Sequence, residues 1–303
     1  MTLPAIGFIG VGLMGAGMAS CLLAAGHPLV VLPHKNRAPV EGLLAKGAIE
    51  AASALELLQG CEVLITCVPN AEVIADLANE LMPHFSAGQM WIDTSTSRPE
   101  TSAQLARDLA ARGAVFADAP LTGGPQQARE GSLASLVGCD AAHFPEVEAI
   151  VGAYSKTVRR FGDAGTGHAA KLLNNLVTQG TTMLLADAFQ CAEKMNVDAR
   201  ALYDIMMSGA ARSGTLQKAV GPALDGNYDG AQFTITNAAK DLRYARDLIE
   251  HAAPSRTALA ALLADRFATL VSDGRGDQFV STMLAPEDLS SRRTKSRLTV
   301  EPP

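Results

Sequence analysis

A glycine-rich loop near the start of the chain constrains its fold more than any other feature. Residues 5–9 form an apolar run, and Gly10, Gly12 and Gly15 follow it before a helical apolar pattern. In a strand–loop–helix unit these glycines allow a tight turn, close approach of a pyrophosphate and close helix packing, and the helix start binds the diphosphate. The chain is therefore expected to begin with a Rossmann-type dinucleotide-binding unit. The loop residues expected at the cofactor are Gly10, Val11, Gly12, Leu13 and Met14.

The turn after the second predicted strand, residues 28–32, bears on the choice between NAD and NADP. An NAD site normally has an acid here, about 20 residues after the glycines, to bind the adenosine ribose hydroxyls. This chain instead has His34, Lys35, Asn36 and Arg37. A 2′-phosphate suits such side chains, above all the bidentate fork of Arg. We predict NADP(H) as the favoured cofactor, with Arg37 as its main contact and NAD(H) as the alternative; a solvated basic turn is the other interpretation.

Further strand ends supply more candidate cofactor contacts. Strand patterns recur over residues 62–69, 89–94 and 114–119. The carboxyl ends of parallel strands share the edge of the sheet where doubly wound folds bind ligands. We expect Val68, Pro69 and Thr96 to contact the cofactor there. Thr96 is left for a ligand because Ser97 and Glu100 fit a capping box for the following helix.

The alternation of strands and helices stops after residue 161. Further strands are expected over residues 131–138 and 157–161, and helices follow over residues 165–195, 198–208, 238–252 and 255–272, with Asp198 as an N-cap. We predict an α/β Rossmann-type doubly wound sheet domain over residues 1–163 and an all-α domain over residues 164–290. The basic residues 291–303 have no apolar period and are expected to form a loose tail.

The helix beginning near Gly165 carries the residues best suited to chemistry. The spacing i, i+3 and i+4 places Lys171, Asn174 and Asn175 on one face. Because most other sides are apolar, we expect a buried central helix. A lysine there either extends its ammonium to water or acts as an acid/base, since partial burial lowers the pKa of an ammonium toward neutrality.

A second candidate site is the sequence Thr122-Gly123-Gly124, which follows the strand at 114–119. Adjacent glycines can present a row of backbone N–H groups to an anion, and Thr122 adds a hydroxyl. A simple turn is the alternative interpretation.

Composition excludes several other classes of protein. The 303 residues are 48% apolar and carry a net charge of −6, which indicates a globular protein and predicts no nucleic-acid partner and no membrane association. No apolar run approaches the ~20 residues of a membrane span, and no secretory signal is evident. Five scattered cysteines suit a reducing cytoplasm, and the six histidines lack metal-ligand spacing, so no metal is predicted.

Five motifs, in this order, resemble those of the β-hydroxyacid dehydrogenase family, which includes 3-hydroxyisobutyrate dehydrogenase, tartronate semialdehyde reductase and glyoxylate/succinic semialdehyde reductases. They lie at residues 7–15, 93–99, 118–124, 165–175 and 240–242. The resemblance implies that Lys171 is the catalytic acid/base and that Thr96 and Lys240 lie at the cofactor or the closed site. It further implies that the substrate is bound by Thr122, Gly123, Gly124, Asn174 and Asn175. From the pattern alone, Lys240 is expected to be solvated on the polar side of its helix.

The implied reaction is the NAD(P)-dependent interconversion of a small β-hydroxyacid and the corresponding aldehyde acid. The expected substrate is a small anionic aldehyde or hydroxy acid, and small residues on the central helix, such as Gly180 and Ala186, favour a homodimer or homotetramer. An imine reductase on the same fold is one alternative, although such relatives usually have Asp or Tyr where Lys171 stands. A non-catalytic NADP(H) sensor is another, and it would be expected to lose the lysine or the amides.

Overall fold

The computed structural model describes residues 3–286, which divide into two compact units between Lys171 and Leu172. This division lies inside the long helix α8 (Thr166–Lys194). The predicted boundary at residue 163 falls earlier, between β9 (Ser155–Gly162) and the start of that helix. The tail predicted over residues 291–303 lies outside the described residues.

The first unit contains a nine-stranded sheet with strand order β3-β2-β1-β4-β5-β6-β8-β7, and β9 pairs with β8. The remaining strands are β1 (Ile6–Ile9), β2 (Leu29–Leu32), β3 (Ile49–Glu50), β4 (Val63–Thr66), β5 (Met90–Asp93), β6 (Val115–Asp118), β7 (Leu121–Thr122) and β8 (Leu133–Gly138). From β3 to β6 every pairing is parallel, whereas β8 is antiparallel to both β6 and β7. The connections run in opposite directions from β1 and from β4, so the switch point of a doubly wound sheet lies between these strands. The predicted Rossmann-type fold is confirmed.

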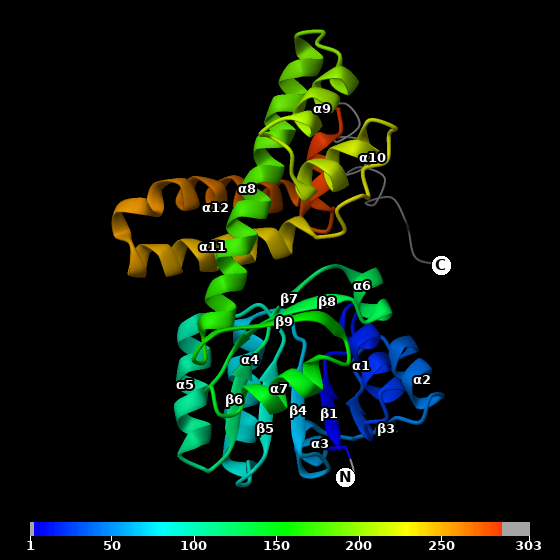
Figure 1. Ribbon diagram of the computed structural model, residues 1–303, viewed down its shortest axis with the longest axis vertical. Helices are drawn as coiled ribbons and strands as arrows, with labels where there is room; N and C mark the ends of the chain where they lie inside the picture. The colour runs from blue at the N-terminus through cyan, green and yellow to red at the C-terminus, as the bar shows by residue number, and fades with distance from the viewer. Residues whose placement is uncertain (1–2, 287–303) are drawn as a thin grey trace. The chain divides into compact units, whose positions relative to one another are not determined.

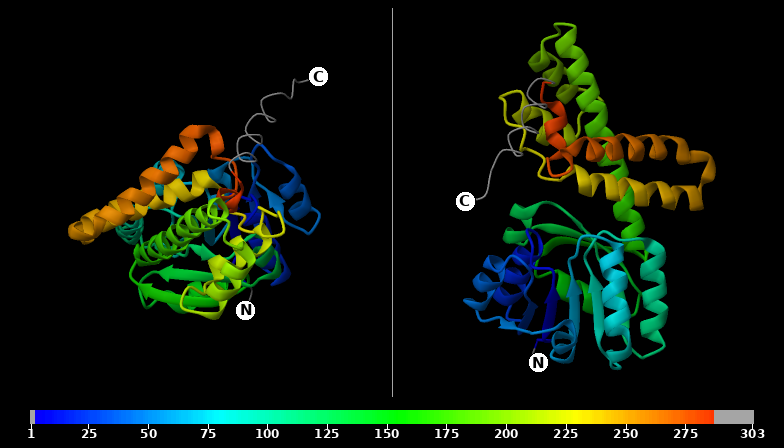
Figure 2. Two further views of the ribbon diagram at one scale, coloured as in Figure 1. Left: turned by 90° about the horizontal axis from the view of Figure 1, so that it is seen from above. Right: turned by 180° about the vertical axis from the view of Figure 1, so that it is seen from behind.

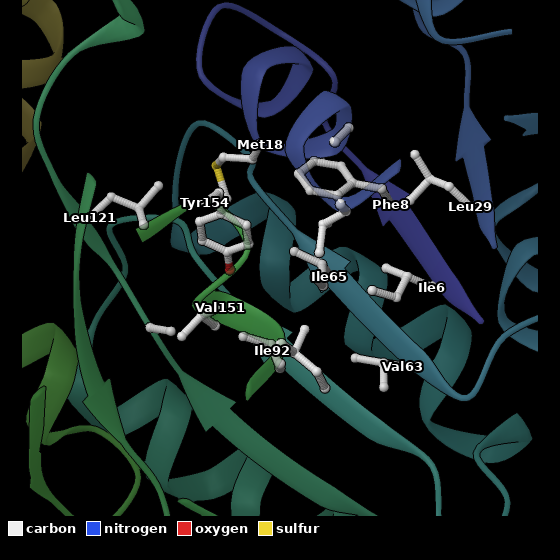
Figure 3. Packing of buried hydrophobic residues seen from close by; sticks show 14 of the residues in the cluster. Ile6, Phe8, Met18, Leu29, Val63, Ile65, Ile92, Leu121, Val151 and Tyr154 are labelled. Atoms are coloured by element: carbon white, nitrogen blue, oxygen red, sulfur yellow. The ribbon is translucent and has the colours of Figure 1, made fainter. Parts of the chain in front are cut away.

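Helices cover both faces of this sheet (Figures 1 and 2). They are α1 (Gly15–Ala24), α2 (Ala38–Leu44), α3 (Ala54–Gln59), α4 (Ala71–Leu81), α5 (Pro99–Ala110), α6 (Pro125–Glu130) and α7 (Phe144–Val151). Successive strand residues point to opposite faces, so each buried strand contributes to two apolar cores. Phe8 and Ile65 pack with Met18 of α1 in one core, which Figure 3 shows from close by. Leu64 and Trp91 pack with α3, α4 and α5 in the other.

The second unit is helical, and its described residues contain no strand, only a single bridge between Thr234 and Phe279. After α8 come α9 (Ala199–Ser208), α10 (Gly221–Ala223), α11 (Ile235–Ala252), α12 (Thr257–Leu270) and the short turns of η2 (Leu216–Val220), η4 (Val271–Arg275) and η5 (Val280–Leu284). Helices α11 and α12 lie side by side in both views of this unit (Figures 1 and 2). Apolar residues of α8, α11 and α12 share one core, as their helical period predicts. The all-α prediction is confirmed.

Two local predictions need correction, and several short elements were not predicted. The sequence pattern missed β3, α2 and α3, which are too short to show an apolar period. Helix α5 has Arg98 as its N-cap residue, so Ser97 lies one position too early for the predicted capping box; its side chain is fully buried instead. Helix α8 is not buried on all sides, because Leu173, Val177 and Leu184 are 47%, 69% and 70% exposed.

Candidate functional site: the carboxyl edge of the sheet and helix α8

The glycine loop after β1 has the shape that a dinucleotide requires. Gly10 has a φ of 102°, and a Cβ at this position would collide with the carbonyl of Cys67. A Cβ on Gly15 would collide with the carbonyl of Gly10. A Cβ on Gly12, in contrast, would meet no atom within 4 Å, so its backbone is open to a ligand. The outer glycines therefore close the turn and the middle one leaves room for a pyrophosphate.

The start of α1 fits a diphosphate group as well. Its N-cap residue is Met14, and within the described chain no side chain caps this end of the helix. Leu13 is 79% exposed, whereas Val11 is buried beneath the loop. The first N–H groups of a helix lack intrahelical acceptors and attract anions. The residues present thus fit the nucleotide that the fold implies.

Polar side chains hold together the strand ends next to this loop. The Ser95 hydroxyl accepts a hydrogen bond from the Val68 backbone N–H at 2.9 Å. The Asp93 carboxylate accepts from the Thr66 hydroxyl at 2.9 Å and from the Ser95 backbone N–H at 3.0 Å. Of the other predicted contacts, Pro69 is exposed and Thr96 is half-buried. Hydrogen bonds of Ser95 and Asp93 thus link the strand ends at this edge, whereas the second Asp93 carboxylate oxygen is buried without a hydrogen-bond partner among the described residues.

The predicted 2′-phosphate site is an exposed turn in which an acid already engages the arginine. His34, Lys35, Asn36 and Arg37 are all exposed at the end of β2. The Arg37 guanidinium donates to both carboxylate oxygens of Glu50 on β3, at 2.8 and 3.3 Å, and this contact raises the pKa of Arg37. The side-chain carbonyl oxygen of Asn36 accepts a hydrogen bond from the Ala38 backbone N–H at 3.2 Å. No acid follows β2 directly, but the neighbouring strand supplies one that the sequence analysis did not identify.

In the loop after β6, where the sequence predicts an anion site, one backbone N–H is already engaged. Thr122 ends β7 and is half-buried, and Gly123 is exposed with a φ of 121°. The Gly124 backbone N–H donates to the side-chain carbonyl oxygen of Gln127 at 2.9 Å. Gln127 therefore caps this loop, and one N–H of the expected anion nest already has an acceptor.

Helix α8 carries the predicted acid/base and the two amides. Lys171 is half-buried at the end of the first unit, and Asn174 is exposed. Asn175 is buried in the second unit, where its side-chain amide donates to Asp241 at 2.6 Å and its carbonyl oxygen accepts from the Asn174 amide at 3.2 Å. The orientation of the Asn175 amide is thus set by Asp241, a residue that the sequence analysis noted only as part of a motif.

Lys240 is not solvated, so the expectation from the charge pattern is wrong. Its side chain is only 13% exposed, and its ammonium lies 2.9 Å from an Asp241 carboxylate oxygen. The same ammonium lies 5.4 Å from the centre of the Tyr244 ring. A charge withdrawn from water in this way needs a paired carboxylate, and Asp241 provides it.

Comparisons with known proteins agree with these features. Residues 5–162 match the NAD-binding domain of 6-phosphogluconate dehydrogenase, and residues 165–286 match the NAD-binding domain of NADP-dependent 3-hydroxyisobutyrate dehydrogenase. The mitochondrial 3-hydroxyisobutyrate dehydrogenase of Drosophila melanogaster is 31% identical over 285 residues, which cover 92% of this chain and 87% of that protein. The chain belongs to the 3-hydroxyisobutyrate dehydrogenase family, one of the β-hydroxyacid dehydrogenases. The resemblance inferred from the five motifs is confirmed.

Other relatives support the same family. The 3-hydroxyisobutyrate dehydrogenase of Pseudomonas aeruginosa is 30% identical over 289 residues, covering 91% of this chain and 96% of that protein. The structure of Mycobacterium tuberculosis 3-hydroxyisobutyrate dehydrogenase with L-serine has a TM-score of 0.84 at 26% identity, covering 93% and 98% of the two chains. Psf3, solved with NADP+ and 2-OPP, has a TM-score of 0.80 at 24% identity, covering 93% and 99%, and shows the shared fold alone.

The family membership makes this chain an NAD(P)-dependent oxidoreductase of the 3-hydroxyisobutyrate dehydrogenase type. No group of three or more His, Cys, Asp or Glu side chains within residues 3–286 is arranged to hold a metal ion. Over the same range, no helix has both the length and the apolar character that a membrane span requires.

Proposed function

We propose that this protein interconverts a small β-hydroxyacid and its aldehyde acid, with NADP(H) as the favoured cofactor and Lys171 as the general acid/base. The observation that carries the proposal is the position of Lys171 on α8, half-buried and one turn before the buried amide of Asn175. A basic side chain held beside a hydrogen-bonding amide suits proton exchange with an alcohol or a carbonyl oxygen. The membership in the dehydrogenase family supports this assignment.

Each group of residues has a proposed part in the reaction. A nicotinamide held there would supply the hydride in reduction and accept it in oxidation. The backbone at Gly12 and the start of α1 bind the diphosphate, and the Thr122 hydroxyl with the Gly123 N–H binds the substrate carboxylate. In reduction, Lys171 donates a proton to the carbonyl oxygen, and in oxidation it accepts the hydroxyl proton. Asn175 would hold a substrate oxygen, with its amide oriented by Asp241.

The proposed preference for NADP(H) rests on the cationic turn at Arg37. A 2′-phosphate has to compete with Glu50 for the guanidinium, or form a shared network with it. The pair is half-exposed, so replacing one acceptor by another costs little. Arg37→Ala is expected to weaken NADPH binding about tenfold or more, while NADH binding stays within about threefold, because a charged hydrogen bond is worth ~1.5–3 kcal/mol.

The decisive experiment measures initial rates of NADPH and NADH oxidation with glyoxylate, succinic semialdehyde, tartronate semialdehyde and methylmalonate semialdehyde. Lys171→Ala is expected to lower kcat by about 10²- to 10⁴-fold with cofactor binding intact. Lys194→Ala, an exposed lysine on the same helix, is the matched control and should keep its kcat. Unchanged turnover in Lys171→Ala would refute the acid/base role. Turnover of cyclic imines alone would favour the imine reductase alternative, and cofactor binding without any turnover would favour a sensor.

The cytoplasmic location and the homo-oligomeric state stay predictions. The related enzymes of Drosophila melanogaster and Bos taurus carry a mitochondrial designation. The exposed apolar side chains of Leu173, Val177 and Leu184 on α8 support assembly, because large exposed apolar residues on one helix favour burial against a partner. Light scattering on the purified protein tests for the predicted homodimer or homotetramer.

A further inference from the structure

Helix α8 is capped by a carboxylate from a distant strand. Asp118 lies at the end of β6 and is fully buried. One of its oxygens accepts from the Gly165 backbone N–H and the other from the His168 backbone N–H, both at 2.6 Å. Helix α8 begins at Thr166 with glycine before it, so no local side chain is available at the N-cap position. Asp118, a residue of the sheet, therefore caps the N-terminus of α8 and places a negative charge at the positive end of the helix dipole.

The side chain of His168 adds further links between the helix and the sheet. It is fully buried, and its Nδ1 lies 2.7 Å from the Ser102 hydroxyl on α5. Its Nε2 lies 3.1 Å from the Ser95 backbone carbonyl. The two ring nitrogens also lie 3.8 Å from carboxylate oxygens of Asp93 and Asp118. The imidazole is therefore held on both sides, and rotation of α8 about its axis would break several hydrogen bonds together.

The Asp118 carboxylate fills the space that side chains at two nearby positions would need, so both positions are glycine. A Cβ on Gly138 would lie 2.5 Å from one carboxylate oxygen, and a Cβ on Gly167 would lie 2.8 Å from the other. Desolvation raises the pKa of Asp118, while His168 and the two backbone N–H groups oppose that rise. The close approach of the end of β6 to the start of α8 thus depends both on glycine at these positions and on the hydrogen bonds of Asp118.

We infer that Asp118 and His168 are positioning residues for the acid/base Lys171, an inference that rests on the proposed function of that lysine. Lys171 lies one turn after His168 on α8, and Thr122 of the substrate loop lies just beyond Asp118 in the chain. One buried carboxylate therefore sets the distance between the group that would move the proton and the loop that would bind the substrate. A misplacement of about 1 Å at a reacting group can cost about 100-fold in rate.

The test compares Asp118→Asn with Asp163→Asn, an exposed acid just before the same helix. An asparagine at position 118 would turn an NH₂ group toward one of the two backbone N–H groups that need an acceptor, so one of the two capping hydrogen bonds would be lost. Asp118→Asn is expected to lower kcat by about 10- to 100-fold, with KM and NADPH affinity within about threefold of the wild type. The deuterium isotope effect on kcat with 4-deuterated NADPH should rise as hydride transfer becomes slower. Asp163→Asn should change none of these values.

The His168 variants keep the inference testable if Asp118→Asn does not fold. His168→Gln retains an N–H donor for the Ser95 carbonyl and should keep more of the kcat than His168→Ala at equal folded concentration. A folded Asp118→Asn with the kcat and isotope effect of the wild type would overturn the inference, as would equal kcat values for the two His168 variants and the wild type. Lys171→Ala, assayed alongside, separates the two proposals. If Lys171→Ala keeps its turnover, the acid/base role of Lys171 is wrong. If Lys171→Ala is inactive while Asp118→Asn is fully active, the acid/base role stands and only the positioning role is refuted.

Discussion

Arg37 and Lys240 are both predicted to lie at the cofactor, yet the structure places their charges in opposite environments. Arg37 is half-exposed on a turn of the first unit, where Glu50 engages it at 2.8 Å. Lys240 is 13% exposed on α11 of the second unit and pairs at 2.9 Å with Asp241, which is itself buried. The N···O distances are almost equal, so the difference between the two pairs that bears most on stability is their exposure to water.

The difference in burial indicates which of the two pairs matters for stability. An exposed ion pair contributes little because water and salt screen it and because ordering long side chains costs entropy. In a buried pair each charge has lost its hydration, so removing one partner leaves the other uncompensated. We therefore expect Arg37 and Glu50 to act mainly on ligand affinity, and Lys240 and Asp241 on the integrity of the second unit.

The largest expected effect follows from removal of the buried carboxylate. Asp241→Ala deprives both the Lys240 ammonium and the Asn175 amide of the acceptor that they share. The free energy of unfolding should fall by about 3–5 kcal/mol, as measured by urea denaturation. Asp265→Ala, an exposed acid on α12, is the control and should stay within about 0.5 kcal/mol of the wild type. A loss below about 1 kcal/mol in Asp241→Ala would mean that water reaches the pair.

Double-mutant cycles on the two pairs compare them directly. We expect a coupling energy of about 2 kcal/mol between Lys240 and Asp241, from Lys240→Met, Asp241→Asn and the double variant. The cycle on Arg37 and Glu50 should give a much smaller coupling energy, which falls further at high salt. Equal coupling energies for the two pairs would contradict the distinction drawn from their burial.

The last expected effect is on cofactor affinity and not on stability. Glu50→Gln removes the acid that competes for Arg37, so NADPH should bind up to about fivefold more tightly, equivalent to the ~1 kcal/mol of an exposed pair. NADH, which lacks the 2′-phosphate, should bind as before. Fluorescence titration at fixed ionic strength measures both. Glu41→Gln is the matched control, since its carboxylate lies farther from Arg37, at 4.0 Å, and its effect should be smaller. Weaker NADPH binding in Glu50→Gln would mean that Glu50 orients the guanidinium rather than competing for it.

The parts of the fold that the sequence predicts well are those governed by local rules. The glycine spacing of the first loop, the apolar strands and the Asp198 cap of α9 all have the predicted form; Asp198 accepts from the Arg200 and Ala201 backbone N–H groups at 2.9 and 3.1 Å. Each of these features depends on residues close together in the chain. Such patterns were sufficient for the fold class and for the family.

The errors occur where distant residues decide the outcome. The helical spacing of α11 predicts a solvated Lys240. That prediction is wrong because the burial of a side chain depends on neighbouring elements such as α12, which the spacing within one helix does not show. Ser97 fits a capping box by spacing, but the chain enters α5 one residue later and turns its side chain inward. No pattern in the turn at Arg37 identifies Glu50 as a partner, since a parallel strand pairing brings it there.

The sequence alone was enough to predict a dinucleotide-binding doubly wound sheet, a helical unit after it, and the dehydrogenase family of the chain. It could do so because glycine conformations, apolar periods and motif order are properties of short stretches. Which charges are buried, and which buried carboxylate caps α8, became clear only from the three-dimensional fold. Asp118 and Gly165 are in contact because the fold brings the end of β6 to the start of α8. The free energy of an ion pair or of a helix cap depends on such contacts between distant residues and on the exclusion of water around them.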